Sequence, residues 1–143
     1  MTTDTDRRIR IPADVERIAD VRALVRDVAA ASDAPIDCED DLVQAVDEAV
    51  TNVILHGYRG SDGRIDVHVE RDAEDIVITI EDAAPTFDPG SVPAPDLTVP
   101  PEHRVPGGMG IHLMRQAADR VEHRPREGGG NILTITRRLR RPA

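Results

Sequence analysis

The chain has 143 residues, of which 39% are hydrophobic, so it is long and apolar enough to bury the core of one ordinary domain. Its formal net charge of −9 argues against nucleic acid as a general partner, because no broad positive field would attract phosphates. No apolar run approaches the roughly 20 residues that cross a bilayer, and MTTDTDRRIRIP has no signal-peptide core. Cys38 is a lone thiol. These features predict a cytoplasmic protein without a membrane partner.

The N-terminal region predicts a strand and then a helix. Residues 8–11 (RIRI) alternate as a strand does. Pro12 and Asp14 then open a helix that Pro35 stops. Its apolar positions recur at helical spacing: Val15, Ile18, Val21, Leu24, Val25 and Val28.

A second helix is predicted from about Asp37 to about His56. Asp37 is a candidate N-cap, and the acidic residues after it suit the positive end of the helix dipole. Gly57 and Gly60 are expected to close the helix.

Two strands, 65–69 and 75–82, follow as a hairpin around the polar turn RDAED. Residues 83–106 then lose all periodicity, and six of the 11 prolines lie between Pro89 and Pro106, which is typical of a functional or disordered loop. A third helix is predicted over 110–121.

The chain closes with a second hairpin, VEHRPRE and NILTITRRL, around Gly128 to Gly130. Pro125 in the first of these segments indicates an edge strand or a bulge. The basic cluster RRLRR at 137–141 is interpreted as a solvated strand end and tail. The order of elements predicts a two-layer α/β sandwich, with an open, mostly antiparallel sheet covered on one face by helices.

Three segments carry candidate chemistry. In DEAVTNVILHGY, Glu48, Asn52 and His56 recur every four residues beside an apolar stripe, with the small Ala45 and Ala49 leaving room for a ligand. Taken alone, a solvated polar face is the simpler interpretation.

In VPGGMGIHLMRQ, Gly107, Gly108 and Gly110 stand where a loop becomes a helix, where unpaired N–H groups and the dipole favour an anion. The pattern is neither a dinucleotide fingerprint nor a P-loop, and alone it could be a tight turn. In IEDAAPTFDP, the Asp82 carboxylate follows a buried strand and could accept a hydrogen bond from an exocyclic amine. Alone it could be an acidic turn.

Together, in order and spacing, the three segments resemble the N, G1 and G2 boxes of the gyrase–chaperone–histidine-kinase ATPase superfamily, the Bergerat fold. Within it the sequence is most similar to the anti-sigma factor serine-protein kinases of bacterial sporulation and general stress. DEAVTNVILHGY resembles E-A-x-x-N-x-x-x-H-x-Y, DAAPTFDP resembles D-x-G-x-x-F-D-P, and GGMGIHLMRQAAD resembles G-G-x-G-[IL]-x-L-[MI]. The resemblance extends from the first strand to Leu139.

The resemblance implies a role for each box. Asn52 would coordinate the Mg²⁺ on the phosphates of ATP or ADP, and Glu48 would be the catalytic base. Asp82 would bind the adenine amine beside Ala84. Residues 88–106 would form a lid. The phosphates would be held by the backbone of Gly107, Gly108, Met109 and Gly110, with Arg104 as a lid cation. His56 and Tyr58 would serve packing and helix termination.

One departure from the family pattern is Ala84, which stands where the D-x-G motif has glycine. Alanine disfavours positive φ. The turn is therefore expected to stay at negative φ, and the alternative is a weakened affinity for nucleotide.

The preferred function is an ATP-dependent protein serine/threonine kinase that phosphorylates a small anti-anti-sigma (STAS-type) antagonist and sequesters a sigma factor or another regulatory protein. The alternatives are a non-catalytic, nucleotide-gated binding module and a scaffold with a vestigial site. The resemblance also implies a homodimer, for which the apolar first helix and the first strand offer a surface.

Overall fold

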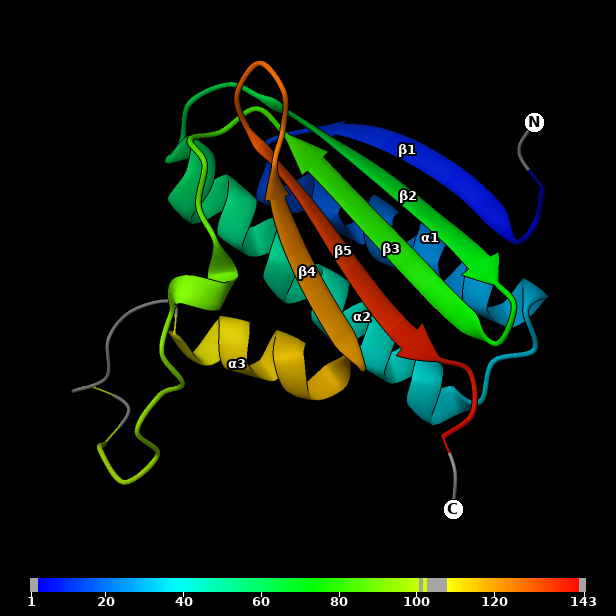
Figure 1. The fold of residues 1–143 in the computed structure, drawn as a ribbon. Coiled ribbons are helices and arrows are strands. Elements are labelled where there is room, and N and C mark those ends of the chain that lie inside the picture. The colour runs from blue at the N-terminus through cyan, green and yellow to red at the C-terminus, as the bar shows by residue number, and fades with distance from the viewer. Residues whose placement is uncertain (1–2, 101, 103–107, 142–143) are drawn as a thin grey trace.

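The computed structural model describes residues 3–100, 102 and 108–141. Its sheet has five strands in the order β1-β2-β3-β5-β4, and every pairing is antiparallel (Figure 1). The strands are β1 Asp6–Pro12, β2 Arg64–Asp72, β3 Asp75–Asp82, β4 Arg120–Pro125 and β5 Asn131–Arg138. The helices are α1 Ile18–Ala31, α2 Ile36–Asn52 and α3 Gly108–Ala117. This is the predicted α/β sandwich, with α1 and α2 behind the sheet in Figure 1.

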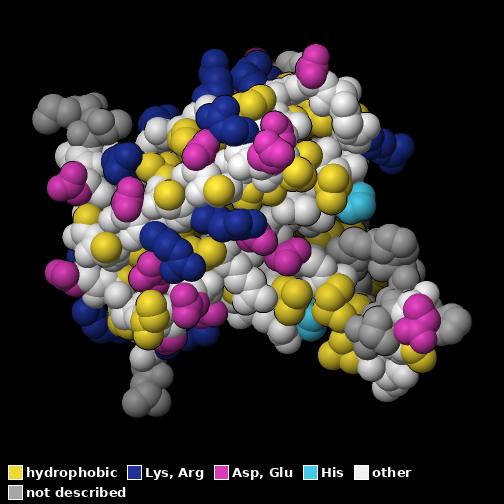
Figure 2. All heavy atoms as spheres, turned by 180° about the vertical axis from the view of Figure 1, so that it is seen from behind, with side chains coloured by type: hydrophobic (Ala, Val, Ile, Leu, Met, Phe, Trp, Pro, Cys, Tyr) yellow, Lys and Arg dark blue, Asp and Glu magenta, His cyan; other side chains and the backbone are white. Residues whose placement is uncertain are grey.

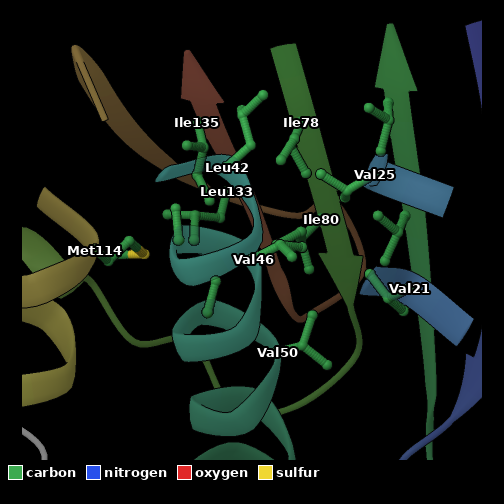
Figure 3. Close-up of a cluster of buried hydrophobic side chains, with 14 of the residues drawn as sticks. Val21, Val25, Leu42, Val46, Val50, Ile78, Ile80, Met114, Leu133 and Ile135 are labelled. Atoms are coloured by element: carbon green, nitrogen blue, oxygen red, sulfur yellow. The ribbon is translucent and has the colours of Figure 1, made fainter. Parts of the chain in front are cut away.

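The core lies between the sheet and the helices. Alternate residues of β3 (Ile76, Ile78 and Ile80) are buried, and Leu133 and Ile135 of β5 join them. Figure 3 shows Ile78, Ile80 and the two β5 side chains facing the apolar stripes of α1 and α2, with Met114 of α3 at one side. Branched aliphatic side chains suit this pleated surface, so the core forms almost without aromatic residues.

The helix boundaries differ from the sequence predictions in three places. α2 begins at Ile36 after Pro35, which makes no side-chain cap, so Asp37 lies in the first turn and is not the N-cap. The helical path continues past Asn52 as a π-helical segment, η2 (Val53–Tyr58), so Gly57 does not close it. α3 ends at Ala117, whereas the prediction carried it to 121. Val121 instead lies in β4 opposite Ile135.

Arg137 is not part of a solvated tail, contrary to the sequence interpretation. Its side chain is 1% exposed, and its guanidinium contacts Asp41 of α2 through Nε (3.1 Å) and Nη2 (3.0 Å). Asp37 lies 3.6 Å from Nη2. The ion pair therefore joins the end of β5 to the first turns of α2, 96 residues away in the sequence.

The apolar face of α1 is also not free to form a dimer surface. Ile18, Val21, Leu24 and Val28 are buried in the protein's own core. On the exposed side of the helical layer, acidic and basic side chains lie close together, with hydrophobic side chains between them (Figure 2). Arg22 of α1, for example, donates to Asp47 of α2 at 2.7 Å. None of the helices within the described residues is long and apolar enough to span a bilayer.

Candidate nucleotide site

The first part of the site is the polar face of α2. Glu48 and Asn52 lie one turn apart, and both are half-buried. Ala45 and Ala49 beside them are buried where α2 packs against the rest of the domain, α3 included. The sequence analysis expected these two alanines to leave room for a ligand. Because both are buried, they do not leave open room.

The start of α3 lies directly against this face. A methyl group placed on Gly110 would stand 2.6 Å from Oε2 of Glu48 and 4.0 Å from Oδ1 of Asn52. A side chain would fill this gap, so glycine is required for the close approach. The glycine-rich helix start and the Glu–Asn face, about 60 residues apart in sequence, are thus brought together. Met109 is half-buried here, whereas Gly107 and Arg104 lie outside the described residues.

Burial affects the ionisation of Glu48. Loss of hydration raises the pKa of its carboxyl above the ordinary value, and the neighbouring charge of Asp47 raises it further. A raised pKa makes the carboxylate a stronger proton acceptor, which suits a general base.

Tyr58, the last residue of η2, is hydrogen-bonded to the turn after β3. The Tyr58 hydroxyl accepts a hydrogen bond from Ala83 N (2.8 Å) and donates one to the Arg64 carbonyl (2.7 Å). The packing role expected for Tyr58 is therefore confirmed. His56 is exposed, so its expected packing role is wrong.

Ala84 is buried in the turn and packs against Gly57 of η2. A methyl on Gly57 would lie 3.0 Å from Cβ of Ala84, so this glycine makes room for the alanine. Ala84 is not among the described non-glycine residues with positive φ, as the sequence analysis predicted. The alanine therefore fits the turn without backbone strain.

Asp82 ends β3 as a buried carboxylate. Its Oδ1 accepts hydrogen bonds from Ala84 N (2.9 Å) and from Nδ2 of Asn131 (3.0 Å). Burial is the main cause of a raised pKa at Asp82, opposed by hydrogen bonds from Asn131 and Ala84 and by the charges of His123 and Arg126. Oδ2 accepts neither of these two bonds.

Asn131, at the start of β5, is the residue that the sequence analysis missed. Its Nδ2 donates to Asp82 and to the Pro85 carbonyl (3.2 Å), while its Oδ1 accepts from Phe87 N (2.8 Å). Oδ1 also accepts from Nε2 of His123 on β4 (2.8 Å). One amide thus orients the Asp82 carboxylate and fixes the turn over 84–87.

His123 extends this network towards the irregular segment. Its Nδ1 lies 3.9 Å from Oδ1 of Asp88, and that oxygen accepts a hydrogen bond from Gly90 N at 2.7 Å. Asp88 thereby begins the short 3₁₀ turn Pro89–Ser91.

A sequence signal for Asn131 does exist. Asn131 is in phase with the buried Leu133 and Ile135, and Asp82 is in phase with the buried Ile78 and Ile80. Two polar residues at core-facing positions indicate a mutual hydrogen bond when the strands pair, and Asp82 does lie opposite Asn131. The pairing of β3 with β5 was the missing information.

Gly130 precedes Asn131 and makes the close approach possible. It has a φ of 116°, and a side chain there would collide with the main-chain oxygen of Asp82. The site therefore depends on the glycine turn as well as on the polar residues.

The sheet, its helical layer and the meeting of the three segments at one end define an ATPase-type α/β domain. The family model of the histidine kinase-like ATPase domain matches residues 11–137, and the chain belongs to this family.

Within this family, the chain is similar to bacterial serine-protein kinases named RsbW. The chain is 26% identical over 130 residues to serine-protein kinase RsbW of Bacillus cereus (strain AH187), covering 88% of this chain and 81% of that protein. RsbW of Bacillus cereus strain B4264 is 27% identical over the same coverage, and RsbW of Bacillus thuringiensis subsp. konkukian is 26% identical.

A solved structure shares the fold. The crystal structure of the RsbU and RsbW domains of Rv1364c from Mycobacterium tuberculosis superposes with a TM-score of 0.69 at 22% identity. The match covers 96% of this chain and 33% of that longer one.

Proposed function

We propose that the protein is an ATP-dependent serine/threonine protein kinase of the anti-sigma factor type. It would phosphorylate a small anti-anti-sigma (STAS-type) antagonist and sequester a sigma factor or another regulatory protein. The observation that carries the proposal is the approach of Gly110 to Glu48 and Asn52. It brings the helix start that would bind phosphate beside the side chains that would act as base and metal ligand. Membership of the ATPase family supports nucleotide binding, and the similarity to RsbW supports protein phosphorylation.

The residues present suit Mg²⁺ and phosphate. Asn52 offers an amide oxygen and would be the Mg²⁺ ligand, since Mg²⁺ prefers oxygen ligands. When bound, Mg²⁺ would neutralise the phosphate charge. The N–H groups of Gly108, Met109 and Gly110 begin α3 and would hold phosphate oxygens with the help of the helix dipole. Gly107 and Arg104 would complete this cradle and the lid over residues 88–106.

Glu48 would be the base for transfer. Its carboxylate would take the proton of the substrate hydroxyl, and the hydroxyl oxygen would bond to the γ-phosphorus as the bond to the bridging oxygen of ADP breaks. The protein's other work is positioning and charge neutralisation. Burial that raises the pKa of Glu48 makes it a better acceptor for that proton.

Asp82 would select adenine. An ionised carboxylate only accepts hydrogen bonds, so Oδ2 would pair with the exocyclic amine of adenine and repel the keto oxygen of guanine. Ala84 would line this pocket. The single-domain organisation, the homodimer and a cytoplasmic location are part of the same proposal.

A nucleotide-gated binding module without catalysis is the second candidate, because Ala84 stands where the D-x-G motif has glycine. Two measurements separate the candidates. ATP and ADP affinities with Mg²⁺, measured by titration calorimetry, should fall in Asn52→Ala and Asp82→Asn. A pull-down from native lysate with Mg-ATP, followed by phosphopeptide mass spectrometry, should yield a phosphoserine or phosphothreonine on a small captured protein. ATP binding without any such product would favour the module, and no nucleotide binding would refute both.

A further inference from the structure

Three potential metal ligands gather on the sheet face that carries no helices. Asp6 belongs to β1, and His68 and Glu70 belong to β2. In β2 these two residues alternate with Val67 and Val69, which are buried against the helices, so they point to the opposite face. The cluster is therefore on the other side of the sheet from Asp82 and Glu48.

Strand register puts the three side chains within reach of one ion. Asp6 lies directly opposite Glu70, and His68 is the next residue on the same face of β2. Nε2 of His68 is 2.6 Å from Oδ1 of Asp6 and 3.9 Å from Oε2 of Glu70. The three ligand atoms all lie within 4.8 Å of one another. Metal bonds of about 2.0–2.2 Å require ligand atoms about 3.4 Å apart, so small side-chain rotations suffice.

The two carboxylates of this cluster also favour a bound cation. Two carboxylates directly opposite each other in an antiparallel pair repel. Among the described residues, His68 is the one basic side chain within 4.0 Å of either Asp6 or Glu70. With His68 neutral, no positive side chain of the described residues lies within 4.0 Å of the two carboxylates, and a divalent cation would neutralise both.

We propose that Asp6, His68 and Glu70 form a binding site for a divalent transition metal of the Zn²⁺ type. The imidazole nitrogen favours Zn²⁺, Co²⁺ or Ni²⁺ over Mg²⁺ and Ca²⁺, which prefer sites made only of oxygen ligands. On metal binding, Nε2 of His68 exchanges its hydrogen bond to Asp6 for a bond to the ion; the Nε2 proton passes to solvent while Nδ1 takes one up, so the ring binds as the neutral tautomer protonated at Nδ1.

Three protein ligands leave a fourth position for water or another ligand. Asp6 and Glu70 are each 38% exposed, so solvent reaches the cluster. His68 also lines a hollow of about 550 Å³ on this sheet face, in which Arg10 and Arg64 pair with Asp66 and Arg126 pairs with Glu81. The site thus differs in face, ligands and preferred metal from the proposed Mg-ATP site.

The test is titration of the metal-free full chain with ZnCl₂ by calorimetry, and with Co²⁺ by visible absorption, without nucleotide. We expect one saturable site and a rise in Tm on binding. Glu70→Gln keeps the His68–Asp6 hydrogen bond and should weaken Zn²⁺ binding by at least about 100-fold, beyond the effect of losing an outer-shell partner. His68→Gln should abolish it. His56→Gln, which changes an exposed histidine on η2, is the matched control and should bind as the wild type does.

Binding that survives Glu70→Gln or His68→Gln unchanged would overturn the proposal, as would the absence of a saturable site in the wild type. Loss of binding in His56→Gln would also overturn it, because the metal would then lie elsewhere. Circular dichroism of each variant establishes that it is folded, so a loss of binding can be assigned to the ligand.

Discussion

Asn131 holds the turn that carries Asp82, so replacing it should damage both stability and nucleotide binding. Asn131→Ala removes four hydrogen bonds of 3.2 Å or less, to Asp82, Pro85, Phe87 and His123. At about 0.5–1.5 kcal/mol each, these bonds sum to about 2–6 kcal/mol. Residues 85–87 are exposed, and water can replace some of the lost partners. We therefore expect a loss of about 2–4 kcal/mol in the free energy of unfolding.

Urea denaturation followed by circular dichroism measures that loss, and a fluorescent ATP analogue measures the accompanying fall in affinity. We expect the affinity to fall by about 10-fold or more, equivalent to about 1.4 kcal/mol, because Asp82 loses the donor that orients it. Thr134→Ala changes the opposite face of the same strand and should alter stability by only about 0.5 kcal/mol. A stability loss below about 1 kcal/mol in Asn131→Ala would refute the assigned role of this amide.

Three further predictions concern packing, charge and pH. Gly57→Ala should destabilise the fold by about 1–2 kcal/mol because the new methyl group crowds Ala84. Adding Ala84→Gly should restore stability in the double mutant. Thermal melts of the two single mutants and the double mutant that show no such coupling would contradict the proposed contact between residues 57 and 84. Arg137→Ala should cost about 2–4 kcal/mol in urea denaturation because it breaks the buried pair with Asp41. Arg137→Met breaks the same pair but keeps most of the volume, so it should cost nearly as much; a loss less than half that of Arg137→Ala would show that volume matters more than the pair. Asp82→Asn should be at least as stable as the wild type at neutral pH but bind ATP more weakly. Burial raises the pKa of Asp82 in the folded state, so wild-type stability should decline as pH rises from the ordinary value of 3.8 through that raised pKa, and the variant should lack this decline.

The sequence predicted the parts of the fold that depend on local periodicity. The strand at 75–82 coincides with β3, and the alternation of Ile76, Ile78 and Ile80 correctly identified its buried face. The end of α3 was misplaced because Val121 fits a helical stripe as well as a strand. Only its pairing with Ile135 decides between the two.

The other errors and omissions also concern residues whose roles depend on partners far away in the sequence. The burial of Arg137 depends on Asp41, and the role of Asn131 depends on Asp82, so both are set by distant partners. The meeting of Gly110 with Glu48 could be expected only through the family resemblance, since no local pattern relates two segments so far apart. The helical path through Gly57 brings this glycine against Ala84, a contact that propensity alone does not predict.

The central claim is that Glu48 acts as the base in phosphate transfer from ATP to a protein hydroxyl. The most direct measurement is single-turnover transfer from γ-labelled ATP to the captured partner, with wild type and Glu48→Gln run at equal occupancy of nucleotide. The account predicts that Glu48→Gln binds Mg-ATP as tightly as the wild type and transfers phosphate about 10²–10⁴-fold more slowly. Transfer at the wild-type rate by Glu48→Gln would contradict it.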